Sequence, residues 1–515
     1  MSAASVAMLP AQNLARLADS LHYKVELQAT LSSGDHSPLW LNANRYGLSS
    51  VEPRYGYLRG AVERPLSADD GRRWGVGYGL DLFGGANVRG YGGSGLKGPL
   101  VQQAYVEARW LKMVLTVGSK QQPMELKNQS LSSGSQVLGI NARPVPQVRL
   151  LLPDYWTVPF TRSWVAVKGH VAYGKTTDDN WQESFTQGQS KYTRDALYHS
   201  KAGYLRIGKP GKPLSVELGL EMACQFGGQS YTNHDSDSYR WVDNGSGVKD
   251  FFAALIPGQG GETVEDMYRN SEGNHLGSWQ ARVNLDYPKW ALGVYAEHFY
   301  EDQSSMFFLD YDGYGTGTDW DKKQKSRFFL YDPKDALLGA ELRLKDLSWL
   351  NTVLLEYVYT KYQSGPIYHD HTQNINTHIS GRDNYYNHYI FTGWQHWGMV
   401  MGNPLYRSPL YNDNGEIVVQ NNRFVAWHLG LSGQPTARLG YRVLATTQKG
   451  YGTYFKLYRE PRTSVSLMAE AAYALPQGWS VKGAVGYDHG DIYGDQTGFQ
   501  LTVAKTGLLK LTSKH

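Results

Sequence analysis

The feature that most constrains the fold is a strict alternation of apolar and polar residues. From residue 279 the sequence reads WQARVNLD, in which every second side chain is apolar and the others are polar or charged. A period of two residues places the two sets on opposite faces of an extended strand. The same alternation occurs over residues 338–345, 352–359, 424–431 and 465–473. The second half of the chain is therefore predicted to consist of two-faced β-strands.

These strands are predicted to form hairpins that are long enough to cross a membrane. Short turns such as YPKW (287–290), DLSW (346–349) and SGQPT (432–436) join successive alternating segments. Each segment has about nine to eleven residues, which is the length of a tilted membrane strand. The 37 Tyr and 57 Gly residues also favour strands and tight turns over helices.

Charge on the second face distinguishes a membrane barrel from a soluble β-propeller or sandwich. A dry core cannot hold many charged side chains without a large desolvation cost, whereas a wet lumen can. We therefore predict an all-β fold, a transmembrane antiparallel β-barrel. Its predicted lumen-facing polar residues are Arg282, Glu341, Arg343, Glu356, Arg438, Arg442, Glu470 and Lys482.

The connections between strands are unequal, which predicts the two ends of the barrel. Short turns alternate with long polar stretches, at roughly 84–100, 119–142, 174–199, 223–277, 301–336 and 361–423. Outer-membrane barrels have short periplasmic turns and long extracellular loops, and a single-chain barrel has an even strand number. The pattern shows about 17 strands, so we predict about 18. The missing strand is predicted near Ala142–Leu150. Both chain termini are then predicted to lie on the periplasmic side.

Composition excludes several other classes of protein. No apolar run approaches the ~18 residues of a spanning helix. The net charge of +4 does not favour nucleic acid as a partner. The single cysteine, Cys224, excludes an internal disulfide and a cysteine-based zinc cluster. Residues 1–20 are predicted to be a signal-peptide remnant or a periplasmic N-terminal segment, and residues 21–510 one barrel domain.

The main candidate site lies late in the longest connection, in the stretch YYNHYIFTGWQHWGMVMGNPL (385–405). Flat rings can cover the C–H faces of a sugar while Asn and His serve its hydroxyls. The stretch is therefore a candidate carbohydrate site. The alternative is a structural plug whose rings pack against the barrel wall. The residues concerned are Tyr385, Tyr386, Trp394, His396, Trp397 and Asn403.

A second candidate is the acidic and aromatic stretch 307–323. Tyr311, Tyr314 and Trp320 alternate with aspartates there, so sugar contact, calcium binding and a solvated loop remain open. His369, His371 and His378 lack a metal-ligand spacing. We predict no metal site and no cofactor.

Several segments resemble the capsule assembly Wzi family. They are SPLWLNANRYGLSS (37–50), YGYLRGAVER (55–64), GRDNYYNH (381–388), GWQHWGMVMGNPL (393–405) and GFQLTVAKTGLL (498–509). The resemblance implies a barrel of about 18 strands in the outer membrane of a Gram-negative bacterium. It also implies a lectin-like role, in which the cell-surface face holds capsular polysaccharide.

Three functions follow as hypotheses. The first is a non-enzymatic outer-membrane lectin, a monomer in outer-membrane lipid that anchors capsular or other surface polysaccharide. The second is a passive channel or porin, supported by the polar lumen. The third is a membrane-embedded enzyme. No nucleophile elbow, zinc signature or spaced carboxylate pair supports the third, so we predict that the protein is not an enzyme.

Overall fold

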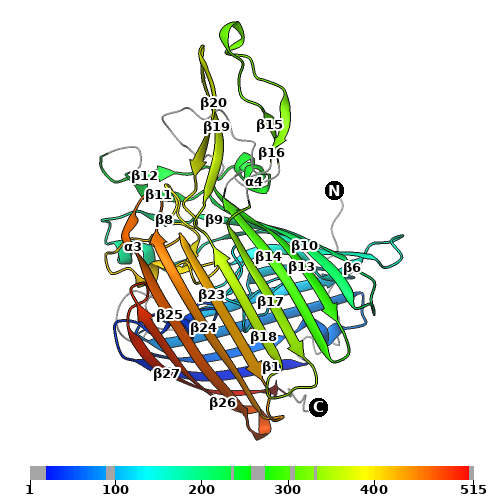
Figure 1. Ribbon diagram of the computed structural model, residues 1–515. Helices are drawn as coiled ribbons and strands as arrows, with labels where there is room; N and C mark the ends of the chain where they lie inside the picture. The colour runs from blue at the N-terminus through cyan, green and yellow to red at the C-terminus, as the bar shows by residue number, and fades with distance from the viewer. Residues whose placement is uncertain are drawn as a thin grey trace, which may run out of the picture.

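The computed structural model describes residues 19–87, 99–233, 237–256, 273–301, 308–329 and 333–509. Within these ranges an 18-stranded antiparallel sheet closes on itself as a barrel (Figure 1). Its strands are β1 (Leu21–Ser32), β2 (Arg54–Arg64), β3 (Trp74–Ala86), β4 (Leu100–Trp110), β5 (Met113–Ser119), β6 (Gln147–Thr157), β7 (Val165–Lys175), β9 (Leu197–Ile207), β10 (Leu214–Phe226), β13 (Asn274–Asp286), β14 (Trp290–Glu301), β17 (Ala336–Leu344), β18 (Thr352–Tyr359), β23 (Phe424–Gly433), β24 (Leu439–Gly452), β25 (Leu457–Ala474), β26 (Trp479–Gly490) and β27 (Gln496–Leu509).

The first and last strands close the barrel. β1 pairs antiparallel with β27 from Leu21 opposite Leu509 to Ser32 opposite Gly498. With an even number of strands, the start of β1 and the end of β27 lie at the same end, which is the end with the short turns. The predicted fold class and strand number are confirmed.

The extra strand needed for an even count is β6, but the prediction placed it about five residues too early. β6 begins at Gln147, after Pro144 and Pro146, and not at Ala142. Proline lacks the N–H that a paired strand must donate, so pairing with β5 starts at Gln147, directly after Pro146.

The alternation of residues matches a barrel with an apolar outside and a polar inside. On β25, Leu467 is exposed on the outer face, while Met468 and Glu470 are buried toward the lumen. Trp74, Trp110, Trp349 and Trp479 are exposed beside the short turns, as in the aromatic belt of a membrane interface.

The two ends of the barrel differ in their connections. Most turns at one end are short, such as residues 111–112 between β4 and β5 and 287–289 between β13 and β14. The opposite end carries long connections such as 227–273 and 360–423, although 453–456 and 491–495 are also short there. We call these the short-turn end and the long-loop end.

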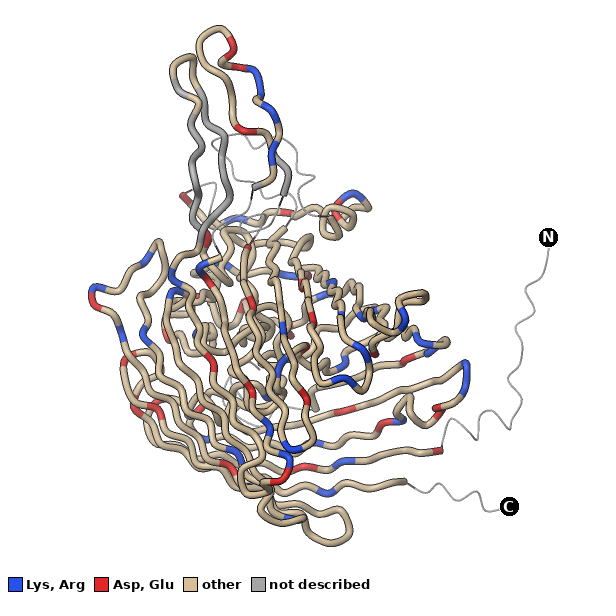
Figure 2. The backbone as a smooth tube through the Cα atoms, turned by 45° about the vertical axis from the view of Figure 1, so that its right-hand side comes forward, with Lys and Arg blue, Asp and Glu red and all other residues tan. Residues whose placement is uncertain are grey.

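The remaining elements belong to the connections. At the long-loop end, the hairpins β15–β16 and β19–β20 project beyond the barrel (Figure 1). Acidic and basic residues both occur along β15–β16 and its turn (Figure 2). No helix in the described ranges is long and apolar enough to span a membrane. These elements are α2 (Leu39–Asn42), η1 (Leu66–Asp69), α3 (Trp181–Thr186), β8 (Tyr192–Arg194), β11 (Gln229–Thr232), β12 (Arg240–Asp243), α4 (Val248–Leu255), β15 (Phe308–Tyr311), η2 (Gly317–Asp319), β16 (Ser326–Phe329), β19 (Ser364–Thr372), β20 (Ile375–Arg382), β21 (Gln395–His396), β22 (Met399–Val400), η3 (Pro409–Tyr411) and η4 (Pro476–Gly478).

Candidate functional site

Three connections from the long-loop end fold into the lumen and form a plug, which we define as residues 33–53, 120–146 and 383–423. Their apolar side chains join lumen-facing residues of the strands in one buried cluster. Trp40 of α2 is buried there, and its Nε1–H donates to Thr446 Oγ1 of β24 at 3.0 Å. The lumen therefore contains a packed core made of the chain's own loops.

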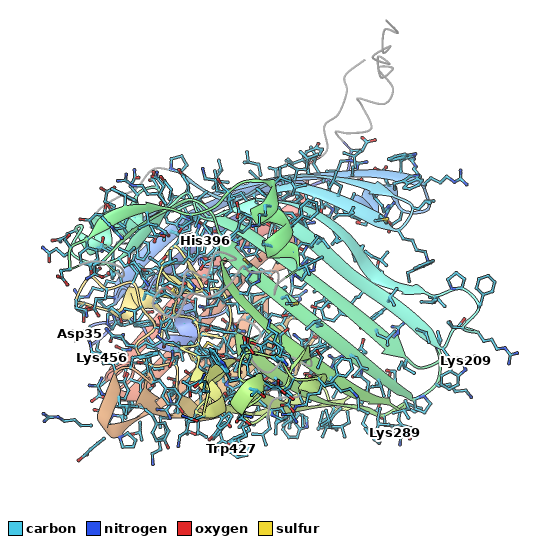
Figure 3. The ribbon with its side chains drawn as sticks, turned by 90° about the horizontal axis from the view of Figure 1, so that it is seen from above. Asp35, Lys209, Lys289, His396, Trp427 and Lys456 are labelled. Carbon is cyan, nitrogen blue, oxygen red and sulfur yellow. The ribbon has the colours of Figure 1, made fainter. Side chains whose placement is uncertain are left out.

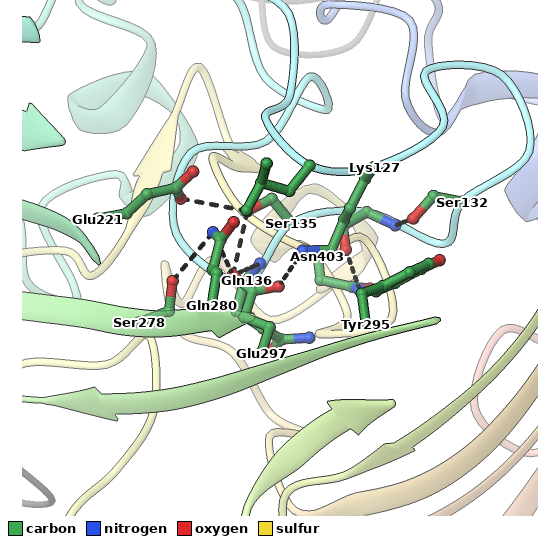
Figure 4. A network of polar contacts seen from close by, with 12 residues as sticks. Lys127, Ser132, Ser135, Gln136, Glu221, Ser278, Gln280, Tyr295, Glu297 and Asn403 are labelled. Atoms are coloured by element: carbon green, nitrogen blue, oxygen red, sulfur yellow. Dashed lines mark hydrogen bonds and ion pairs between the residues drawn. The ribbon is translucent and has the colours of Figure 1, made fainter. Parts of the chain in front are cut away.

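Three buried glutamates on the barrel wall hold the second plug segment. Two of them, Glu221 and Glu297, are labelled in Figure 4. Glu297 of β14 pairs with Lys127 Nζ at 2.6 Å and accepts the Gln136 N–H at 3.0 Å. Glu356 of β18 accepts hydrogen bonds from Ser132 Oγ at 2.6 Å and the Ser133 N–H at 2.7 Å. Glu221 of β10 accepts from Ser135 Oγ at 3.3 Å. Charge-assisted hydrogen bonds of this kind fix the loop to the wall.

The structure buries all six side chains of the first predicted site, Tyr385, Tyr386, Trp394, His396, Trp397 and Asn403. Tyr385 Oη donates to Asp335 at 2.8 Å, and burial raises the pKa of that tyrosine well above its usual value. Trp394 Nε1–H donates to the Val137 carbonyl at 2.9 Å. These rings pack within the plug, so contact between them and a sugar stays a prediction.

His396 is a buried, neutral hydrogen-bonding group in the plug. Seen from above, it lies inside the ring of strands, whereas Trp427 lies on the outside (Figure 3). Its Nδ1–H donates to the Arg143 carbonyl at 2.9 Å, and its Nε2 accepts the Thr177 N–H at 3.1 Å. Burial, with the nearby Arg143 charge, lowers the pKa of His396 to about 4.

The predicted lumen-facing polar residues mostly contact each other or the plug. Arg282 pairs with Glu341 at 2.8 Å and donates to the Leu126 carbonyl at 3.0 Å. Arg442 pairs with Glu470 at 2.8 Å, and Arg442 also donates to the Ser130 carbonyl. Of the rest, Arg343 pairs with Glu341, Lys482 with Glu470 and Glu356 with the plug, while Arg438 is exposed in the short turn before β24.

The second predicted site lies on the projecting β15–β16 hairpin. The rings of Tyr311 and Tyr314 meet edge to face at 5.4 Å, and Lys323 Nζ lies 4.5 Å from the Tyr311 ring centre. Trp320 is half-buried in the turn. The structure places these three aromatic residues in one hairpin, far in sequence from the plug stretch. Phe307, where the predicted stretch began, lies outside the described residues.

An aromatic cluster that sequence reasoning missed lies at the long-loop end, on the small sheet formed by β8, β11 and β12. Tyr231 pairs directly with Tyr192 on one side and with Trp241 on the other, so the three rings share one face. Their ring centres are 5.1–5.4 Å apart, and Tyr239 stacks on Tyr231 at 5.3 Å. Tyr192 is buried and Trp241 is 39% exposed.

A polar row lies beside these rings. Gln229 pairs with Arg194 and with Asp243, two residues along each strand, and therefore shares the same face. Arg194 Cζ lies 4.5 Å from the Trp241 ring centre, and Arg194 pairs with Glu183 at 2.5 Å. Gln229 Nε2 donates to Asp243 at 2.7 Å. We call Tyr192, Arg194, Gln229, Tyr231, Tyr239, Trp241 and Asp243 the aromatic platform.

The platform can bind a ligand that has apolar faces and hydroxyl groups. Its rings offer flat apolar area, and its exposed amide, carboxylate and guanidinium groups offer donors and acceptors. In the described part of the chain, no group of three or more His, Cys, Asp or Glu residues is placed to hold a metal ion.

A closed barrel whose lumen is filled by its own loops defines the class of the protein, a plugged transmembrane β-barrel of the outer-membrane type. The sequence profile of the family described as capsule assembly protein Wzi matches residues 73–330. The chain therefore belongs to the Wzi capsule assembly family, and it is an outer-membrane protein. A search of curated protein sequences gave no match.

Among the solved structures that match this chain, one is from this family. Wzi from Escherichia coli, an outer membrane protein involved in group 1 capsule assembly and described as a carbohydrate-binding β-barrel, matches with a TM-score of 0.51. The identity is 13%, over 96% of this chain and 86% of that one. OprD from Pseudomonas aeruginosa matches with a TM-score of 0.43 and 11% identity, over 95% of each chain. OccAB3 from Acinetobacter baumannii matches with a TM-score of 0.44 and 9% identity, over 95% of this chain and 99% of that one.

Proposed function

We propose that this protein is a non-enzymatic, lectin-like barrel that holds capsular polysaccharide at the cell surface. The observation that carries the proposal is the aromatic platform at the long-loop end, a cluster of rings with Trp241 exposed, beside a row of exposed polar groups. Family membership supports the same role, because the Escherichia coli relative is described as carbohydrate-binding. The protein would act as a monomer surrounded by outer-membrane lipid.

Within this proposal the platform is the first sugar-binding site to test. Trp241 and Tyr231 would stack on the C–H faces of a sugar ring, and Arg194, Gln229 and Asp243 would bind its hydroxyl or carboxylate groups. The hairpin residues Tyr311, Tyr314 and Trp320 form a second patch that a long polymer could reach. The six buried residues of the 385–405 stretch would bind sugar only if the plug moved.

The test is direct binding of purified protein in detergent to oligosaccharides from the capsule of its own source, measured by calorimetry. We expect Trp241→Ala to weaken binding by about 1–3 kcal/mol, a scale taken from base stacking on aromatic side chains. Trp349→Ala, which removes an exposed ring at the short-turn end, is the matched control and should bind as the unchanged protein does.

The other outcomes assign the site elsewhere or reject the function. Weakening by Trp320→Ala alone would move the site to the β15–β16 hairpin. Weakening by Trp394→Ala alone, in a protein that keeps its fold, would move it to the plug stretch. Absence of binding to any capsule oligosaccharide would contradict the proposal.

A further inference from the structure

Four consecutive wall strands present a basic residue on the outer face at the long-loop end. Lys334 precedes β17, Lys361 follows β18, Arg423 precedes β23 and Lys449 lies near the end of β24. Each lies an even number of residues from the exposed, outward residues of the neighbouring strand segment, such as Leu338 on β17. We call these four residues the basic rim.

Strand pairing makes the rim continuous. Tyr359 of β18 pairs with Val425 of β23, and Val425 pairs with Lys449 of β24. Lys361 lies two residues after Tyr359 and Arg423 two residues before Val425, just beyond the ends of their strands. The Arg423 Nε–H donates to the Lys361 carbonyl at 3.1 Å, which ties the two strand ends together.

Tyrosine rings hold these cations in place without neutralising them. Lys361 Nζ lies 3.9 Å from the Tyr451 ring centre, and Arg423 Cζ lies 4.1 Å from that of Tyr454. Lys334 Nζ lies 4.4 Å from the ring centre of Tyr362. A cation over a ring face keeps its positive charge and its remaining N–H donors available.

For three of the four rim residues, no carboxylate of the described residues compensates the charge. Within the described ranges, none forms an ion pair with Lys361, Arg423 or Lys449. Asp335, next to Lys334 in sequence, is buried and faces the lumen side, where it accepts the N–H groups of Tyr362 at 2.8 Å and Gln363 at 2.6 Å. Lys361, Arg423 and Lys449 therefore offer positive charge toward the outside of the barrel.

A groove runs down the outer wall from the rim. It has a volume of about 230 Å³ and is lined by Lys334, Ala336, Leu338, Tyr357 and Tyr359. Its polar end is the rim and its lining is otherwise aliphatic or aromatic. Trp427 extends the apolar surface, since its ring lies 4.8 Å from that of Tyr357, and it points away from the lumen (Figure 3).

We propose that the basic rim binds the phosphate groups of a phosphorylated glycolipid of the outer leaflet, of the lipid A type, with one acyl chain in the groove. A chain of cations at head-group level above an apolar wall matches a lipid whose head group is anionic and whose tails are hydrocarbon. This site faces the membrane and does not depend on the proposed polysaccharide site.

The experiment measures binding of diphosphorylated lipid A to the purified barrel by native mass spectrometry in a neutral detergent. Lys334→Gln, Lys361→Gln, Arg423→Gln and Lys449→Gln are combined in one variant. We expect this variant to bind the lipid at least about tenfold more weakly than the unchanged protein, because it loses four charge contacts. A pair at the short-turn end, Lys209→Gln with Lys289→Gln, is the matched control (Figure 3) and should bind normally.

A second lipid separates the head group from the tails. Dephosphorylated lipid A should bind the unchanged protein as weakly as the phosphorylated lipid binds the rim variant. Equal binding of both lipids, or equal binding by the rim variant and the unchanged protein, would overturn the proposal. If the fourfold variant does not migrate as a folded barrel in a gel, Lys361→Gln with Lys449→Gln gives the same comparison.

Discussion

At the residue scale, side chains of one kind have very different roles in this protein. Trp394 is buried in the plug, Trp241 is partly exposed on the platform and Trp427 is exposed on the outer wall. The residue type alone could not distinguish the three. Only their surroundings decide whether a ring fills the lumen, meets solvent or faces lipid.

We expect His396 to make the plug sensitive to acid. The pKa of His396 is lowered to about 4 from an ordinary value near 6.5 because the ring is buried neutral. Between these values the unfolded segment binds a proton that the folded one does not, so stability is complete above pH 6.5 and is lost as pH falls toward 4. The difference is roughly 3 kcal/mol. Hydrogen exchange of the peptide 393–403 should show this loss of protection between pH 7 and pH 4.5.

Two variants test whether the imidazole of His396 causes the pH dependence. His396→Gln should remove the pH dependence while making the segment less protected at neutral pH, because the two hydrogen bonds of the ring are imperfectly replaced. His489→Gln, which changes an exposed histidine at the long-loop end, should leave the dependence intact. A protection factor that does not change with pH in the native protein would rule out this role for His396.

At the element scale, the plug segment 127–138 is held by wall carboxylates that the strand pattern alone predicts only in part. Glu356 was predicted to face the lumen from its alternation with apolar neighbours. Glu221 and Glu297 obey the same parity and hold the same loop, yet their partners lie more than eighty residues away in sequence. Alternation tells which face a side chain occupies, whereas it cannot tell which loop will reach it.

The Lys127–Glu297 pair should be a strong anchor of the plug. Both side chains are almost fully buried, so Glu297→Gln leaves an ammonium group without its counter-ion. We expect a cost of about 3–5 kcal/mol in the local stability of residues 127–138. The double variant Lys127→Met with Glu297→Gln should cost much less, since no unpaired charge remains. Hydrogen exchange of the peptide 127–138 measures the loss of local stability in each variant. Equal losses in the single and double variants would contradict the charge argument.

The elements also show which parts of the fold could be predicted. Hairpin strands were found because their partners are adjacent in sequence, and the even strand number revealed β6 despite its prolines. The aromatic platform was missed because β8 and β11 are separated by β9 and β10, and the pairing of Tyr192 with Tyr231 leaves no local pattern. A search for alternating aromatic and polar residues within 223–277 would have found Gln229, Tyr231, Trp241 and Asp243.

At the scale of the whole molecule, the barrel separates three environments. The outer wall is apolar and carries the basic rim at one end, the lumen holds a packed plug, and the long-loop end presents the platform. The polar lumen face predicted from the sequence is compatible with a channel as well as with a lectin. Packing inside the lumen distinguishes the two, because water-filled passage requires space that the plug occupies.

Conductance in planar bilayers tests this directly. We expect the native protein to show no steady open pore, because plug residues such as Trp40 and Trp394 are buried against wall strands and wall glutamates hold the loops. Replacing residues 385–405 by a Gly/Ser segment of equal length removes the buried rings while keeping the chain connected, and should produce a steady open pore. The same replacement of residues 311–323, in the projecting hairpin, should leave the barrel closed. A steady pore in the native protein would favour the passive channel over the polysaccharide-holding role, because the plug would then have to leave the lumen at rest.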